Sequence, residues 1–285
     1  MATLKQIRRR IRSVQSTKQI TKAMEMVAAA KLRRAQSKAE SARPYAKTME
    51  HVLSNLSSAA RSLSHPLFEV RETERVMLAV ISSDKGLCGS FNANVLRRAE
   101  ERIRELELEP EQIDLVPVGR RGWQYFRRRH WKVPGAVDRL GDQIDLDLVQ
   151  RIGRYATESF LSGQVDRVEF VYTRFVTTAK RTVEIVPLLP IVPESEEEAD
   201  VPYIFEPDAE EVFEALLPRY VRTQILSVIA DSLASEHSAR MISMGNATKN
   251  ADEMIANLTL TANKLRQAAI TGELLEIVGG AAALE

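Results

Sequence analysis

A seam of small and apolar residues, repeated every three or four positions, runs through both ends of the chain. The first seam extends from Leu4 to Leu63 and the second from Ala230 to Ala269. A period of 3.5 residues kept over so many turns predicts two long helices that wrap around each other in a left-handed supercoil. Many seam positions are alanine, which lets helix backbones approach closely. We therefore expect the two helices to pair as an antiparallel two-helix coiled coil.

The two helices differ in expected length. The N-terminal helix is predicted over residues 1–63, with a kink or irregularity near Pro44, and the C-terminal helix over residues 208–285, with Pro218 as a second kink site. If both leave the middle of the chain at one level, the last ~15 residues, from about Ile270, project beyond the partner helix. This tip carries few charges, which suits a smooth plug inside an apolar sleeve and equally suits a frayed terminus.

The middle of the chain, residues 74–193, has a different pattern. Short apolar runs alternate there with stretches of helical spacing. The runs are Val76–Ile81, Ile113–Val118, Val168–Tyr172 and Thr182–Leu189, and the helical stretches are Val95–Leu106 and Leu146–Leu161. Strands that alternate with helices predict a central Rossmann-like α/β domain with a largely parallel sheet. The acidic residues 194–207 are predicted to be a connecting loop.

Positive charge is concentrated at the N-terminal end. Residues 1–50 contain thirteen Lys and Arg residues against three Glu residues, although the formal net charge is only +1. Such a helix suits acidic partners, and a coiled-coil protein that organises nucleic acid is one alternative. Aromatic residues that would stack on bases are missing from the first 44 residues, which weakens that alternative. The Arg-rich start also resembles a mitochondrial transit peptide, but its apolar spacing continues into the seam, so we expect mature helix.

Signals for catalysis or cofactor binding are weak. The loop Ser82–Ser90 follows a predicted strand and precedes a helix, yet it lacks the glycine spacing of both phosphate-binding fingerprints. The four histidines show no metal-site spacing, and a single cysteine, Cys88, excludes an intrachain disulfide. We expect no catalytic residue, no cofactor and no metal site. A nucleotide-using enzyme built on the middle domain is a second alternative.

Apolar runs long enough to cross a bilayer, about 18 residues, are missing from the sequence. Any membrane association is therefore expected to come through partners.

Four segments are specific enough to compare with known families. They are Ile20–Val27, Asp84–Gly89, Ser235–Met241 and Ile270–Ala281. In this order they resemble blocks of the γ subunits of bacterial F-type ATP synthases, and the resemblance covers all the predicted parts. It implies a shaft inside a hexamer of α and β subunits that transmits the rotation of a membrane ring of c subunits and regulates ATPase activity.

The resemblance also implies partners and a location. The partners would be the α, β and ε subunits and the c ring, with no nucleic acid and no catalysis by this chain. The protein would lie on the cytoplasmic side of the cell membrane, bound there only through the complex. Plastid members carry an inserted segment with a regulatory cysteine pair, which this sequence lacks, so thiol control of that type is not expected.

Individual contacts follow from the same resemblance. It implies contacts with β for two groups of residues, one being Arg266 and Gln267 and the other Lys18, Lys22, Met24 and Glu25. It places Ile270, Thr271, Glu273 and Glu276 in the shaft tip. Contacts with ε and the c ring are implied for Tyr203, Phe205 and Glu206.

Overall fold

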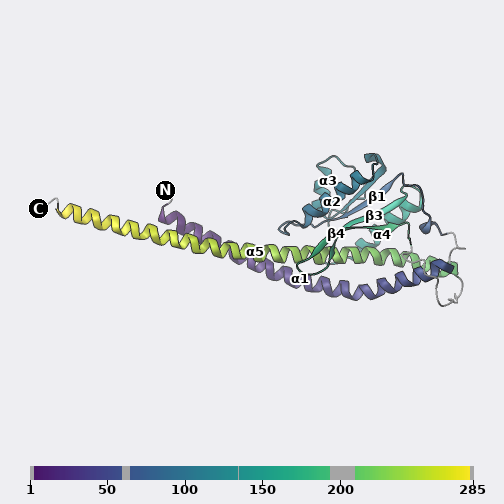
Figure 1. The fold of residues 1–285 in the computed structure, drawn as a ribbon, viewed down its shortest axis with the longest axis horizontal. Helices are drawn as coiled ribbons and strands as arrows, with labels where there is room; N and C mark the ends of the chain where they lie inside the picture. The colour runs from purple at the N-terminus through teal and green to yellow at the C-terminus, as the bar shows by residue number, and fades with distance from the viewer. Residues whose placement is uncertain (1–2, 60–64, 134, 193–208, 283–285) are drawn as a thin grey trace. The chain divides into compact units, whose positions relative to one another are not determined.

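The computed structural model describes residues 3–59, 65–133, 135–192 and 209–282. The chain divides into two compact units, and each contains parts of both long helices (Figure 1). The first unit comprises residues 1–28 and 240–285, and the second comprises residues 29–239. The domain boundaries that the sequence suggests, near residues 63, 74, 193 and 208, stay a prediction.

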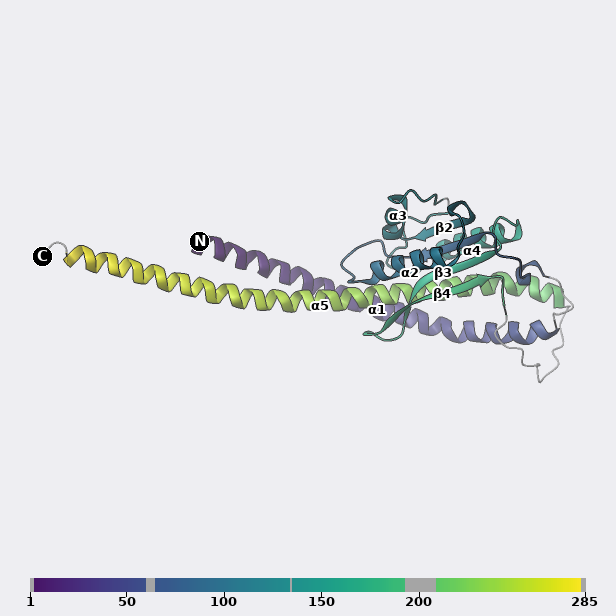
Figure 2. The ribbon, with the colours of Figure 1, turned by 45° about the horizontal axis from the view of Figure 1, so that its top comes forward.

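The first unit is a pair of antiparallel helices, the start of α1 (Leu4–Ala59) and the end of α5 (Ala209–Ala282). The hydroxyls of Thr21 and Thr248 share a hydrogen bond of 2.8 Å, and the Lys18 ammonium lies 2.5 Å from a carboxylate oxygen of Asp252. The number of the facing residue on α5 rises as the number on α1 falls, and the two add up to about 270. The helices therefore run in opposite directions. Figure 2 follows this pair in purple and yellow. The predicted antiparallel pairing is confirmed.

Burial in this pair follows the predicted seam. The buried residues of the first unit are Ile7, Thr21 and Ala28 on α1, and Met244, Ala251 and Ala262 among the seam positions of α5. Small side chains at several of these positions permit close contact between the backbones. Both helices continue as single elements through Pro44 and Pro218, because one proline removes only one hydrogen bond of a long ladder.

The second unit contains a four-stranded sheet in the order β2-β1-β3-β4. Its strands are β1 (Val76–Ile81), β2 (Ile113–Val118), β3 (Arg167–Phe175) and β4 (Arg181–Leu189). β1 pairs in parallel with β2 and β3, whereas β4 runs antiparallel to β3 at the edge of the sheet. The predicted α/β fold with a largely parallel sheet is confirmed.

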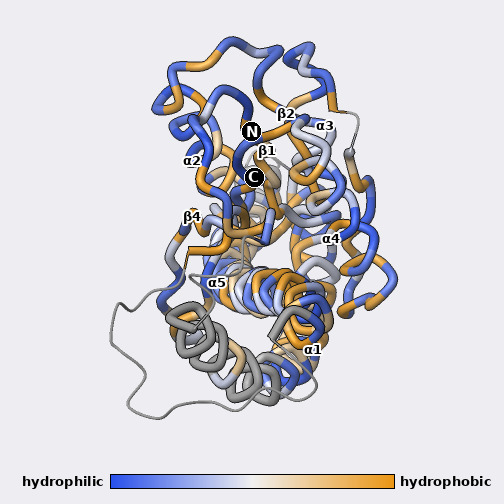
Figure 3. The backbone as a smooth tube through the Cα atoms, turned by 90° about the vertical axis from the view of Figure 1, so that its right-hand side faces the viewer, coloured by the Kyte–Doolittle hydropathy of each residue, from blue (hydrophilic) through white to orange (hydrophobic). Residues whose placement is uncertain are grey.

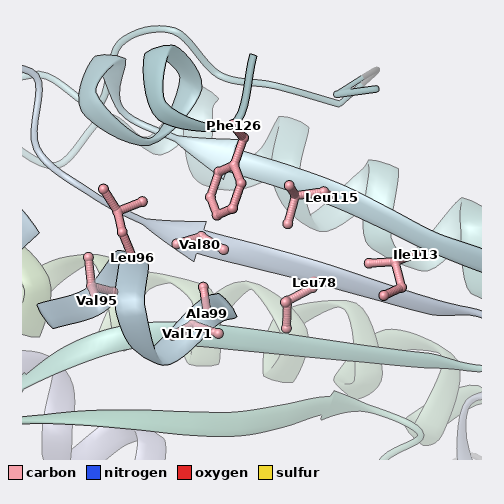
Figure 4. Close-up of a cluster of buried hydrophobic side chains, with 9 residues drawn as sticks. All are labelled: Leu78, Val80, Val95, Leu96, Ala99, Ile113, Leu115, Phe126 and Val171. Atoms are coloured by element: carbon pink, nitrogen blue, oxygen red, sulfur yellow. The ribbon is translucent and has the colours of Figure 1, made fainter. Parts of the chain in front are cut away.

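One face of the sheet packs against α2 (Phe91–Glu105) and α3 (Arg120–Arg127). Figure 4 shows the buried apolar cluster between them, which consists of Leu78, Val80, Val95, Leu96, Ala99, Ile113, Leu115, Phe126 and Val171. The strand members alternate along β1 and β2, as side chains on one face of a sheet must. The sequence pattern does not predict α3, because only Gly122 and Phe126 of its eight residues are buried and the helix is too short for its period to be recognised.

The opposite face packs against α4 (Leu146–Leu161) and the first part of α5. Figure 3 shows α2 and α4 on opposite sides of the hydrophobic strands. A Cβ atom at Gly153 of α4 would lie 3.4 Å from the Ile225 side chain, so α4 and α5 approach closely at this glycine. Two short 3-10 helices, Pro66–Phe68 and Pro110–Gln112, precede β1 and β2.

Two carboxylates are held inside this unit. Glu169 of β3 is 1% exposed, and Arg102 donates to both of its oxygens at 2.7 and 2.8 Å. Asp114 of β2 accepts a hydrogen bond of 2.6 Å from the Tyr155 hydroxyl of α4. Burial raises the pKa of Asp114 above its usual value, and the bond from Tyr155 opposes this rise only in part. The pKa of Tyr155 is also raised, by burial and by the neighbouring carboxylate.

Candidate partner-binding surface

The N-terminal residues predicted to contact β lie on α1 within the helix pair, and several contact α5. Lys18 pairs with Asp252, and Lys22 lies 3.2 Å from the Glu25 carboxylate. The Glu25 carboxylate also lies beside Gly245, where a Cβ atom would come within 3.5 Å of it. Lys18 and Glu25 are therefore partly engaged inside the pair, and they help to set its register as well as its surface charge.

Apolar side chains on the outside of α1 are more available to a partner. Ile20, Met26 and Val27 are 60%, 59% and 54% exposed, whereas Met24 is half-buried. The sequence marks Ile20, Met24 and Val27 as a second apolar stripe beside the seam. Since water-exposed aliphatic side chains at helical spacing are costly to leave uncovered, this stripe is a candidate contact surface.

On α5, Arg266 and Gln267 mark the point where the partner helix begins. The register places Leu4, the first residue of α1, opposite Arg266. The side chains of Arg266 and Gln267 are both exposed, and α5 continues to Ala282. Adjacent residues on a helix point in directions about 100° apart, so these two side chains cover neighbouring parts of its surface.

Most of the residues from 268 to 277 on α5 are exposed as well. They include the predicted tip residues Ile270, Thr271, Glu273 and Glu276. Thr271 donates a hydrogen bond of 2.9 Å from its hydroxyl to the Gln267 carbonyl, so its side chain turns back to its own helix. Leu274, Leu275 and Ile277 are 57% to 68% exposed. Tyr203, Phe205 and Glu206, which are predicted to contact ε and the c ring, lie outside the described residues.

The loop Ser82–Ser90, which stands where a phosphate loop would stand, is filled by groups of the chain itself. The Asp84 carboxylate accepts backbone N–H groups from Arg120, Leu140 and Gly141 at 2.9 to 3.1 Å. An acidic side chain at the start of α3 thus takes the place that an anionic ligand would take. This geometry supports a structural role for the loop.

Among the residues that the structure describes, no group of three His, Cys, Asp or Glu side chains is placed to hold a metal ion. None of the helices in the same part of the chain is both long and apolar enough to cross a membrane.

The antiparallel helix pair of the first unit and the α/β fold of the second define the class of fold, and the comparisons with known proteins give the family. The model of the ATP synthase family matches residues 3–284. The chain is 47% identical to the ATP synthase gamma chain of Pelotomaculum thermopropionicum and 46% identical to that of Desulforamulus reducens, each over the full length of both chains.

Solved structures agree on the fold. The chain matches a component of the Euglena gracilis mitochondrial ATP synthase with a TM-score of 0.68 and 17% identity, covering 99% of this chain and 94% of the other. It also matches a component of the central stalk and c ring of the Tetrahymena thermophila enzyme with a TM-score of 0.61 and 23% identity, covering 80% and 99% of the two chains. The chain belongs to the family of ATP synthase gamma chains.

Proposed function

We propose that this chain is the rotating shaft of an F-type ATP synthase and that it carries no catalytic site of its own. It transmits the rotation of the c ring to the hexamer of α and β subunits, where ATP is made. Family membership over the whole chain supports this function, and the relatives give no support to the alternative of a nucleic-acid-organising protein.

The observation that carries the proposal is the set of exposed apolar side chains on the helix pair of the first unit. Ile20, Met26 and Val27 project from α1, while α5 extends past the start of α1 with exposed apolar residues. A shaft of this kind presents different side chains to each catalytic subunit at each angle. Rotation can then favour one conformation of a β subunit over another, because only differential contacts shift such an equilibrium.

Specific contacts follow from this function. Arg266 and Gln267 would hydrogen-bond an acidic loop of β, which suits the fixed donor fork of arginine. Lys18, Lys22, Met24 and Glu25 would lie beside the moving part of β. The tip, Ile270, Thr271, Glu273 and Glu276, would turn within the hexamer, and Tyr203, Phe205 and Glu206 would contact ε and the c ring.

The same function assigns a location. Membrane attachment would come only through the c ring, on the cytoplasmic side of the cell membrane. The chain would also regulate ATPase activity and proton flow, since a shaft that stops turning blocks both.

The double variant Arg266→Ala and Gln267→Ala tests the contact with β. Both side chains are exposed, so the chain should fold with an unchanged melting temperature. Proton-driven ATP synthesis by the complete complex in vesicles should fall, because the charge-assisted bonds to β are lost. A control variant, Lys264→Ala, changes an exposed cation two residues away. Normal synthesis by the double variant would contradict this contact.

A further inference from the structure

Among the residues that the structure describes, part of the β3 edge has no strand paired to it. The last pair between β1 and β3 joins Val80 and Val171, yet β3 continues to Phe175. On its other side β3 stays paired with β4 over this stretch, including Thr173 with Val183. Thr173 is only 4% exposed, so its peptide groups that face away from β4 need partners other than water.

Serines of α5 supply these partners. The Thr173 N–H donates to the Ser232 hydroxyl at 3.4 Å, and the Ser235 hydroxyl donates to the Thr173 carbonyl at 3.0 Å. Ser238 donates to the Thr178 carbonyl in the turn between β3 and β4. Ser232, Ser235 and Ser238, which we call the serine ladder, follow one another at intervals of three residues and share one face of α5.

The hydrogen bonds of the serine ladder make the contact between α5 and β3 directional. Its three serines are at most 1% exposed, and buried hydroxyls are costly unless they are hydrogen-bonded. Apolar side chains would bury the same surface at less cost, but the attraction between them has no preferred direction. Hydrogen bonds to both backbone groups of one residue, Thr173, fix the position of α5 both along β3 and around its own axis.

The Arg181 side chain strengthens this attachment at the beginning of β4. Its guanidinium donates to the Ser238 hydroxyl at 3.0 Å and to the Thr178 carbonyl at 3.2 Å. The Thr178 carbonyl in the turn between β3 and β4 thus accepts hydrogen bonds from Ser238 of α5 and from Arg181 of β4.

A second attachment links the same unit to α1. The Lys31 ammonium lies 2.7 Å from the Asp142 carboxylate, and Lys85 lies 3.5 Å from the same oxygen. Asp84 holds the loop that carries Asp142, because it accepts the N–H groups of Leu140 and Gly141. Both long helices of this unit are therefore tied to loops at the ends of the sheet strands.

We propose that the serine ladder is a positioning device that locks the sheet to α5, so that the α/β part and the long helices of the second unit turn as one body. The inference rests on the proposed rotor function, and it assigns the ladder to the transmission of rotation rather than to contact with α or β. Loosening the ladder should leave ATP hydrolysis by the α, β and γ subunits intact. It should lower the number of protons pumped for each ATP hydrolysed.

Two variants of nearly equal shape test this lock. Ser235→Thr keeps the hydroxyl, whereas Ser235→Val has the same branching without it, so any crowding is common to both. The complete complex with each variant is placed in vesicles, and ATP hydrolysis and proton pumping are measured together. We expect the ratio of pumping to hydrolysis to be lower in the valine variant than in the threonine variant, because the buried Thr173 carbonyl loses the donor that Ser235 supplies. Ser227→Ala, a half-buried serine on the same helix, is the control.

Equal ratios in the threonine and valine variants would overturn the lock. If the unmodified chain fails to assemble with α and β, the rotor function itself is wrong. The lock between the serine ladder and β3 is then tested by hydrogen exchange in the isolated full-length chain. Hydrogen exchange of the residues 173–180 should be faster in Ser235→Val than in Ser235→Thr. Identical exchange in the two variants would also overturn the lock.

Discussion

Replacing Glu169 by glutamine should destabilise the α/β unit by a predictable amount. Glu169 is 1% exposed, receives two hydrogen bonds from Arg102, and lies 2.7 Å from the Arg167 guanidinium. Glutamine keeps the shape but removes the charge that both arginines neutralise. A fully buried ion pair that loses one partner costs 3–5 kcal/mol, as a rule. Here the Arg102 and Arg167 side chains are 20% and 38% exposed and can partly rehydrate, so we expect about 2 to 3 kcal/mol.

Thermal unfolding of the full chain, followed by circular dichroism, measures this cost. A loss of about 2 to 3 kcal/mol corresponds to a fall of about 5 to 10 °C for a unit of this size. Glu105→Gln is the matched control, since Glu105 also pairs with Arg102 but its side chain is 45% exposed. The control should have the same melting temperature as the unmodified chain. Equal melting temperatures for Glu169→Gln and the control would refute the reasoning from burial.

The remaining predictions concern pH, the helix pair and the single thiol. The raised pKa of Asp114 contributes stability that is present below the unfolded-state pKa and is lost as pH rises through the folded-state pKa. The melting temperature of the unmodified chain should therefore rise relative to Asp114→Asn as the pH falls toward the ordinary aspartate pKa of about 3.9, and a constant difference would contradict this. In the helix pair, replacing both Thr21 and Thr248 by valine should cost less than the sum of the two single changes, because each single change leaves the other hydroxyl without its partner across the pair. A double-mutant cycle of melting temperatures measures this coupling, and strict additivity would argue against it. Cys88 is 2% exposed, so a thiol reagent should modify it slowly in the folded chain and rapidly in denaturant, whereas fast modification under native conditions would show that the site opens.

Local sequence patterns predicted the helices and strands whose buried residues recur at a regular spacing. The heptad seam gave α1 and α5, and the apolar runs gave β1 and β2 with the bounds that the structure has. The short helix α3 was missed because too few of its residues are buried for a period to show. The antiparallel direction of β4 was not recognised, since the turn at residues 176–180 contains no glycine, proline, asparagine or aspartate to mark a hairpin.

Functional contacts needed more than the pattern of residues. The sequence placed Lys18 at a contact with β, but it held no sign that this lysine pairs with Asp252 across the helix pair. Ser232, Ser235 and Ser238 are regularly spaced in the sequence. Their role does not follow from this spacing, because it depends on β3 extending beyond its pairing with β1. Buried charges such as Glu169 were hidden for the same reason, because burial of a polar residue depends on distant partners.

The most direct test of the rotor function is the ATPase activity of purified α and β subunits, measured with and without this chain, together with the activity of the chain alone. The account predicts a stable assembly of the three subunits with a changed turnover, and no hydrolysis by this chain on its own. Failure to assemble, or hydrolysis of ATP by the isolated chain, would contradict the role of a non-catalytic shaft.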